Sequence, residues 1–103
     1  MALILKWTEA AAQDIVSIAE FISRDSEFYA EVVVKKIIEK IKSLPDSPEI
    51  GRVVPEVDDE KIRERFVYSY RIVYQITPHI LWIVAIFHGK QLVESKLSVR
   101  LDS

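Results

Sequence analysis

The sequence predicts a single α+β domain: an N-terminal strand and an antiparallel helical hairpin packed on a mostly antiparallel, twisted four-stranded sheet. Residues 8–44 contain two amphipathic segments with apolar residues three and four positions apart. Residues 62–87 contain three strand-like segments separated by short turns. Half of the 103 residues are hydrophobic and only two are glycine, so residues 1–103 can form one well-packed domain.

The first helix is expected to follow a short apolar strand over residues 2–7. Thr8 is suited to cap its N-terminus, the alanines after it favour helix, and the helix should end near Arg24. Its apolar stripe comprises Ala11, Ile15, Ile18, Ala19 and Ile22.

The second helix is expected to begin at Asp25 or Ser26 and to stop before Pro45. Neither helix can bury its stripe alone, so the two should form a hairpin that lies on a sheet. The second stripe comprises Phe28, Tyr29, Val33, Ile37, Ile41 and Leu44.

Residues 44–60 are expected to form an irregular connector, because three prolines and a glycine interrupt them. The connector ends in acidic residues that lack the spacing of a calcium-binding loop, so we expect a solvated loop, no metal site and no cofactor. These residues are Glu56, Asp58, Asp59 and Glu60.

The predicted sheet is built mainly from residues 62–67, 70–76 and 80–87. The last of these segments is apolar without alternation, as in a central strand that is buried on both faces. Residues 89–103 show no strong period, and a short strand, a loose helix and a mobile tail all remain open for them.

Charge and composition favour a soluble, cytoplasmic protein with an acidic protein partner. The chain has no cysteine, no signal peptide and no apolar stretch long enough to span a membrane. Residues 1–60 carry a net charge of −6 and residues 61–103 a net charge of +4, which is small for a protein that grips a nucleic-acid backbone.

The candidate functional residues lie in and next to the sheet. Arg63 and Arg65 share one strand face, opposite Glu64, and can hold a carboxylate or phosphate together or pair with the acidic connector. Arg71 and His88 are candidates for the phosphate-holding cation and the general base that cleavage of RNA through its 2′-hydroxyl needs. Alternatively, His88 only bonds a backbone carbonyl.

The order of these elements and several short motifs resemble the RelE/ParE superfamily of toxins from type II toxin–antitoxin systems. The motifs are Trp7-Thr8 with Ala12 and Asp14, Ser47-Pro48-Glu49-Ile50-Gly51-Arg52, Arg63-Glu64, Tyr70-Arg71-Ile72-Val73-Tyr74 and His88-Gly89. The resemblance implies growth arrest, plasmid stabilization and neutralisation by an antitoxin bound in a hetero-oligomer. It also makes Arg63, Arg65, Arg71 and Lys90 candidates for binding the target or the antitoxin.

The resemblance leaves three functions open. ParE-like toxins inhibit DNA gyrase without a hydrolytic site, and this branch is closer to the motifs here. RelE-like toxins are ribosome-dependent mRNA endoribonucleases; here Gln91, Leu97, Ile62 and Glu64 replace groups they use. Some ribonucleases resembling YoeB use a glutamate, an arginine and a histidine, and Glu64, Arg71 and His88 match these three residue types. Strand alternation counts against this match, because Glu64 should face away from Arg63 and Arg65. The third function is that of a degenerate toxin that only binds its antitoxin and co-represses the operon.

Overall fold

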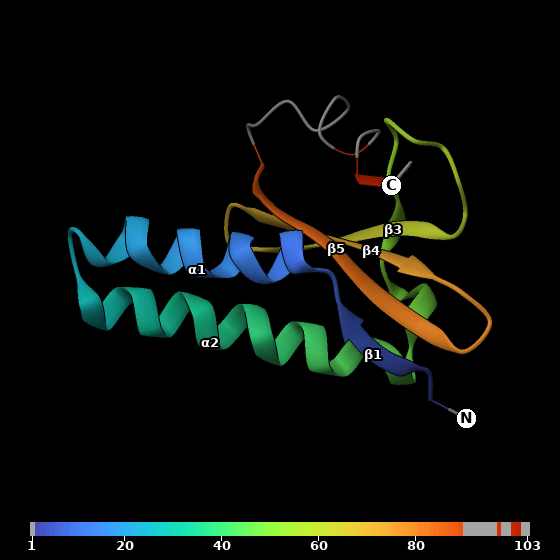
Figure 1. Ribbon diagram of the computed structural model, residues 1–103, viewed down its shortest axis with the longest axis horizontal. Helices are drawn as coiled ribbons and strands as arrows, with labels where there is room; N and C mark the ends of the chain where they lie inside the picture. Colours follow the sequence, from blue (N-terminus) through green and yellow to red (C-terminus); the bar gives the residue numbers. More distant parts are fainter. Residues whose placement is uncertain (1, 90–96, 98–99, 102–103) are drawn as a thin grey trace.

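A computed structural model describes residues 2–89, Leu97, Arg100 and Leu101. Its sheet has five strands in the order β1-β5-β4-β3-β2, and a helical hairpin packs against one face (Figure 1). β1 (Ile4–Trp7) runs parallel to β5 (Ile80–His88), and the other neighbouring pairs are antiparallel. The predicted α+β class and mostly antiparallel sheet are therefore confirmed.

The predicted number of four strands is wrong, because the connector contributes a strand of its own. β2 (Arg52–Val53) pairs with β3 (Ile62–Val67), which in turn pairs with β4 (Tyr70–Ile76). Two residues are too short a segment to show a sequence period of two, so this strand depends on the edge of β3 that it joins.

The two helices begin at side-chain caps that the sequence predicts. The Thr8 hydroxyl accepts a hydrogen bond from the backbone N–H of Ala11 at 3.1 Å at the start of α1 (Glu9–Ser23). Ser26, rather than Asp25, caps α2 (Glu27–Ser43). Two short 3₁₀ turns follow α2, at Leu44–Asp46 and Pro48–Ile50. No helix among the described residues has both the length and the apolar character to cross a membrane.

The expected burial of the start of the second stripe is wrong. Val33, Ile37 and Ile41 are buried, but Phe28 is 76% exposed and Tyr29 is 50% exposed. Both lie in the first turn of α2, where the hairpin extends beyond the sheet (Figure 1). Periodicity marks the face of a helix that turns inward, but it does not show how far the sheet reaches beneath it.

The sheet is buried on both faces, as the apolar sequence of β5 predicts. The inner face packs on the hairpin through residues that include Ile72, Tyr74, Leu81, Ile83 and Ile86. The outer face carries a second cluster, made of Val54, Ile62, Val73, Val84, Ala85, Phe87 and Leu97.

Most of the expected C-terminal tail lies outside the described residues. Leu97, Arg100 and Leu101 are described and have helical backbone, and Leu97 is fully buried against the outer face of the sheet. Of the expected tail, the structure thus describes one side chain that packs in the core of the domain, that of Leu97.

Tyr74 ties the connector to the sheet. Its buried hydroxyl accepts a hydrogen bond from the Gly51 N–H at 2.9 Å and donates one to the Pro48 carbonyl at 2.7 Å. Burial raises the pKa of this hydroxyl, so it stays protonated and able to donate at neutral pH. A Cβ atom at Gly51 would lie 2.4 Å from the Tyr74 hydroxyl oxygen and 2.7 Å from the Glu64 carbonyl oxygen, which leaves room only for glycine.

We expect Gly51→Ala to lower the free energy of unfolding by about 3 kcal/mol, because the methyl group must displace both Tyr74 and the backbone of β3. Tyr74→Phe, which removes the same hydrogen bonds without a clash, should cost less, about 1–2 kcal/mol. Urea unfolding measures both values. A Gly51→Ala protein as stable as wild type would contradict this packing.

Candidate functional site

A buried ion cluster lies on the outer face of the sheet. Glu64 on β3 is 1% exposed and Arg71 on β4 is 6% exposed. The Arg71 Nε donates to Glu64 Oε1 at 2.9 Å, and Arg71 Nη2 also contacts this oxygen. Arg52 on β2 donates its Nε to the other carboxylate oxygen of Glu64. A buried carboxylate needs such partners, because an unpaired charge in this environment is strongly unfavourable.

The connector closes the cluster with a second carboxylate. Arg71 Nη1 donates to Glu56 Oε2 at 2.9 Å and Arg71 Nη2 to Glu56 Oε1 at 3.1 Å, which is a bidentate ion pair. The hydrogen bonds from Arg71 lower the pKa of Glu56, and the pair with Glu56 raises the pKa of Arg71. Two arginines and two glutamates therefore form one neutral network.

Arg63 and Arg65 do not join this network, because they lie on the opposite face of β3. The guanidinium of Arg63 donates to the backbone carbonyls of Glu60 and Gly51, both at 2.9 Å, and to that of Glu49 at 3.3 Å. Arg65 is partly buried on the same side. The candidate binding residues are therefore divided between two faces, and Lys90 lies outside the described residues.

His88 lies across the sheet from Arg71. It pairs with Tyr70 in the β4–β5 register, whereas Arg71 pairs with Phe87, and side chains alternate between faces along a strand. The His88 and Tyr70 rings meet edge to face, with centroids 5.7 Å apart. Glu64, Arg71 and His88 are the three residues that resemble a YoeB-like ribonuclease site. The structure brings Glu64 and Arg71 together but places His88 on the opposite face of the sheet.

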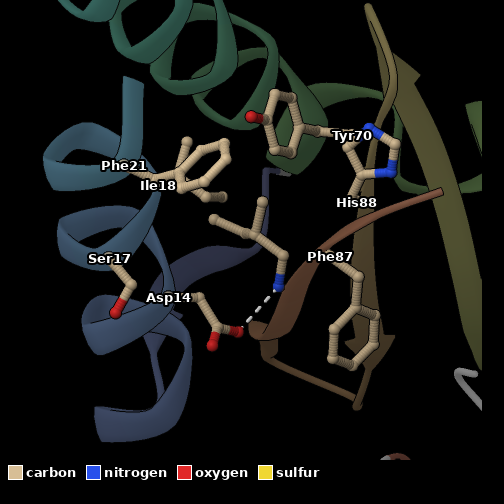
Figure 2. A pocket seen from close by; sticks show the side chains of 8 residues that line it. Asp14, Ser17, Ile18, Phe21, Tyr70, Phe87 and His88 are labelled. Carbon is tan, nitrogen blue, oxygen red and sulfur yellow. Dashed lines mark hydrogen bonds between the residues drawn. The ribbon is translucent and has the colours of Figure 1, made fainter. Parts of the chain in front are cut away.

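His88 and Tyr70 belong to a groove of about 460 Å³ between α1 and the end of β5 (Figure 2). Its walls are mainly apolar, and burial raises the pKa of the Tyr70 hydroxyl, which stays neutral at physiological pH. Phe21 lies at the groove and is 65% exposed. The lining residues are Asp14, Ser17, Ile18, Phe21, Tyr70, Ile86, Phe87 and His88.

Asp14 links the elements around this groove through hydrogen bonds and an ion pair. Its Oδ2 accepts the N–H of Ile86 at 2.9 Å (Figure 2) and Arg100 Nη1 at 2.7 Å, and its Oδ1 accepts Arg100 Nη2 at 3.0 Å. Arg100 also donates to the Val84 carbonyl at 3.0 Å. This contact joins α1, β5 and the C-terminal segment at one point.

Sequence reasoning missed Arg52, Asp14 and Arg100 as partners in these clusters. It assigned the acidic connector to Arg63 and Arg65, but Arg63 bonds backbone carbonyls of the connector, and the carboxylate of Glu56 pairs with Arg71 instead. Among the described residues, no three histidine or acidic side chains lie close enough to hold a metal ion.

Several solved structures that are described as toxins or toxin–antitoxin systems are similar in fold to this chain. The chromosomal ParDE system from P. aeruginosa is similar, with a TM-score of 0.72 and 21% identity over 86% of this chain and 98% of that one. A mutant of the E. coli toxin RelE in the free state has a TM-score of 0.68 and 18% identity over 99% and 97%. The RelBE2 toxin–antitoxin complex from Mycobacterium tuberculosis has a TM-score of 0.61 and 15% identity over 85% and 99%.

The sequence places the protein within this group. A model of the family described as the ParE toxin of type II toxin–antitoxin systems, parDE, matches residues 5–93. The chain belongs to this ParE toxin family, a branch of the RelE/ParE superfamily. No curated protein sequence matches it.

We expect Arg71→Ala to lower the free energy of unfolding by about 3 kcal/mol, because it removes the main partner of the buried Glu64 carboxylate. Arg65→Ala, on the other face of β3, is the matched control and should change it by less than about 0.5 kcal/mol. Urea unfolding distinguishes the two. Equal effects would contradict the structural role of Arg71.

The pair between Arg71 and Glu56 also predicts a pH dependence. Because the pKa of Glu56 is lowered in the folded chain, its stabilising effect is present above the ordinary glutamate pKa of about 4.3 and is lost as the pH falls through the lower folded value. Wild type should therefore lose more stability than Glu56→Gln between about pH 5 and about pH 3. Glu60→Gln should follow wild type, and parallel curves for Glu56→Gln and wild type would contradict the pair.

Proposed function

We propose that this toxin inhibits DNA gyrase without hydrolysing a substrate, and that a cognate antitoxin neutralises it in the cytoplasm by forming a hetero-oligomer. The observation that supports this proposal most is that Arg71 is already paired with carboxylates of its own chain. Its guanidinium contacts both Glu56 and Glu64, so it presents no net positive charge to a phosphate.

The same geometry weighs against the ribonuclease alternative. Cleavage through a 2′-hydroxyl needs a base and a phosphate-holding cation on the same substrate, within hydrogen-bond reach of the groups they act on. His88 and Arg71 face opposite sides of the sheet, and a buried Glu64 would repel the phosphate that Arg71 would have to hold. Glu64 here stabilises an arginine and has no path to a substrate proton.

The groove of Figure 2 is the surface that we assign to the antitoxin. The P. aeruginosa and M. tuberculosis neighbours are described as toxin–antitoxin assemblies, which supports an antitoxin as the partner of this chain. The groove offers exposed apolar area at Phe21 next to the partly buried Ile18 and Tyr70. Apolar surface of this kind is typical of the centre of a protein interface.

The purified toxin should block the supercoiling of relaxed plasmid by gyrase, and His88→Ala should block it equally well, because no proton transfer is involved. The matched reaction contains the toxin together with its antitoxin and should show normal supercoiling. Ribosome-dependent mRNA cleavage that is abolished in His88→Ala would favour the ribonuclease instead. A folded protein that affects neither reaction but binds antitoxin would be a degenerate toxin.

Phe21→Asp should weaken antitoxin binding by at least about tenfold, because it places a charge on the apolar groove wall. Glu20→Ala, on the neighbouring position of α1, is the control and should bind like wild type. Isothermal titration calorimetry gives both affinities. An unchanged affinity for Phe21→Asp would place the antitoxin on another surface.

A further inference from the structure

The outer face of the sheet carries two arginines next to one exposed phenylalanine. The Cζ atoms of Arg52 and Arg71 lie 5.6 Å and 5.8 Å from the centroid of the Phe66 ring. Phe66 is 46% exposed and the Arg52 side chain is 62% exposed, so these two residues are open to a partner, whereas the Arg71 side chain is 7% exposed. Arginine and aromatic side chains together are typical of the residues that dominate protein interfaces.

One carboxylate already occupies this group, and it comes from the connector. Glu56 binds both Nη atoms of Arg71, yet its own side chain is 31% exposed. Glu64 contacts both arginines, and its one negative charge cancels one of their two positive charges. A single positive charge therefore remains for a second carboxylate. The site therefore has the geometry and the charge for one planar carboxylate, and Glu56 fills it from within the chain.

We propose that Arg52, Phe66 and Arg71 form a docking site for a partner peptide segment that presents one aspartate or glutamate beside an apolar side chain, and that Glu56 is its internal competitor. The partner carboxylate takes the place of Glu56 on Arg71, and the apolar side chain packs on the exposed face of Phe66. Because one ion pair replaces another and Glu56 returns to water, the exchange requires no buried charge to be left unpaired.

The surroundings favour a peptide over a nucleic acid. Asp58, Asp59 and Glu60 follow Glu56 and are exposed, so a chain of phosphates along this face would meet repeated negative charge. A peptide with a single carboxylate meets that repulsion at one charge only. Tyr68, which is 55% exposed at the nearby β3–β4 turn, adds a further aromatic surface at the same end of β3.

A tethered competitor lowers the apparent affinity for the partner, since its local concentration is high. Weakening that competitor should therefore expose the site. Glu56→Gln keeps the shape of the side chain and removes its charge, whereas Glu60→Gln removes a charge from the same connector without touching Arg71 and serves as the control. This inference does not depend on whether gyrase is the target.

The test is an NMR titration of the folded full-length chain, following the Nε–Hε signals of Arg52 and Arg71. The probes are a blocked tripeptide with glutamate between two leucines, the same peptide with glutamine, and inorganic phosphate. We expect Glu56→Gln to bind the glutamate peptide about tenfold more tightly than wild type or Glu60→Gln does, with no such gain for the glutamine peptide. Arg52→Ala in the Glu56→Gln background should remove most of the gain.

Several results would overturn the proposal. These are an unchanged affinity in Glu56→Gln, an equal gain for both peptides, or no binding of the glutamate peptide to any variant. A gain for inorganic phosphate as large as that for the glutamate peptide would mark a general anion site, and the peptide assignment would then be wrong. Unfolding curves of each variant, recorded in parallel, show that a lost signal does not come from a lost fold.

Discussion

The buried carboxylate of Glu64 is the constraint on which the outer half of the structure depends. A charge with 1% exposure must be paired, and its partners come from two other strands, Arg71 on β4 and Arg52 on β2. Pairing with Arg52 places the two-residue strand β2 beside β3. Because Arg71 also binds Glu56, the same network draws the connector over the outer face, where Val54 completes the second apolar cluster.

The sheet thus separates two surfaces with different chemistry. On the hairpin side, His88 and Tyr70 line an apolar groove whose floor is held by Asp14. On the other side, Arg71 is neutralised by carboxylates of its own chain. A catalytic pair of Arg71 and His88 would have to act through the sheet, whereas two binding surfaces can operate independently. This separation agrees with the proposal that the toxin acts by binding a protein target.

The extent to which sequence predicted this architecture differs between elements for physical reasons. The helices and the long strands follow from hydrophobic periods that repeat over many residues, and the opposite facing of Glu64 and Arg63 follows from strand alternation. β2 is too short to carry a period, and exposure of Phe28 depends on how far the sheet extends under α2. The bond between Arg71 and Glu56 joins residues 15 positions apart, and neither local propensity nor composition specifies such a distant partner.

The measurement that tests this account most directly is pulse-labelling of cells after induction of the toxin alone, with thymidine and methionine incorporation followed side by side. If the toxin acts on gyrase, replication fails first, so thymidine incorporation should fall while methionine incorporation continues. Co-expression of the antitoxin should restore both. An earlier fall in methionine incorporation would identify translation as the target, and it would contradict the proposal that Arg71 and His88 take no part in catalysis.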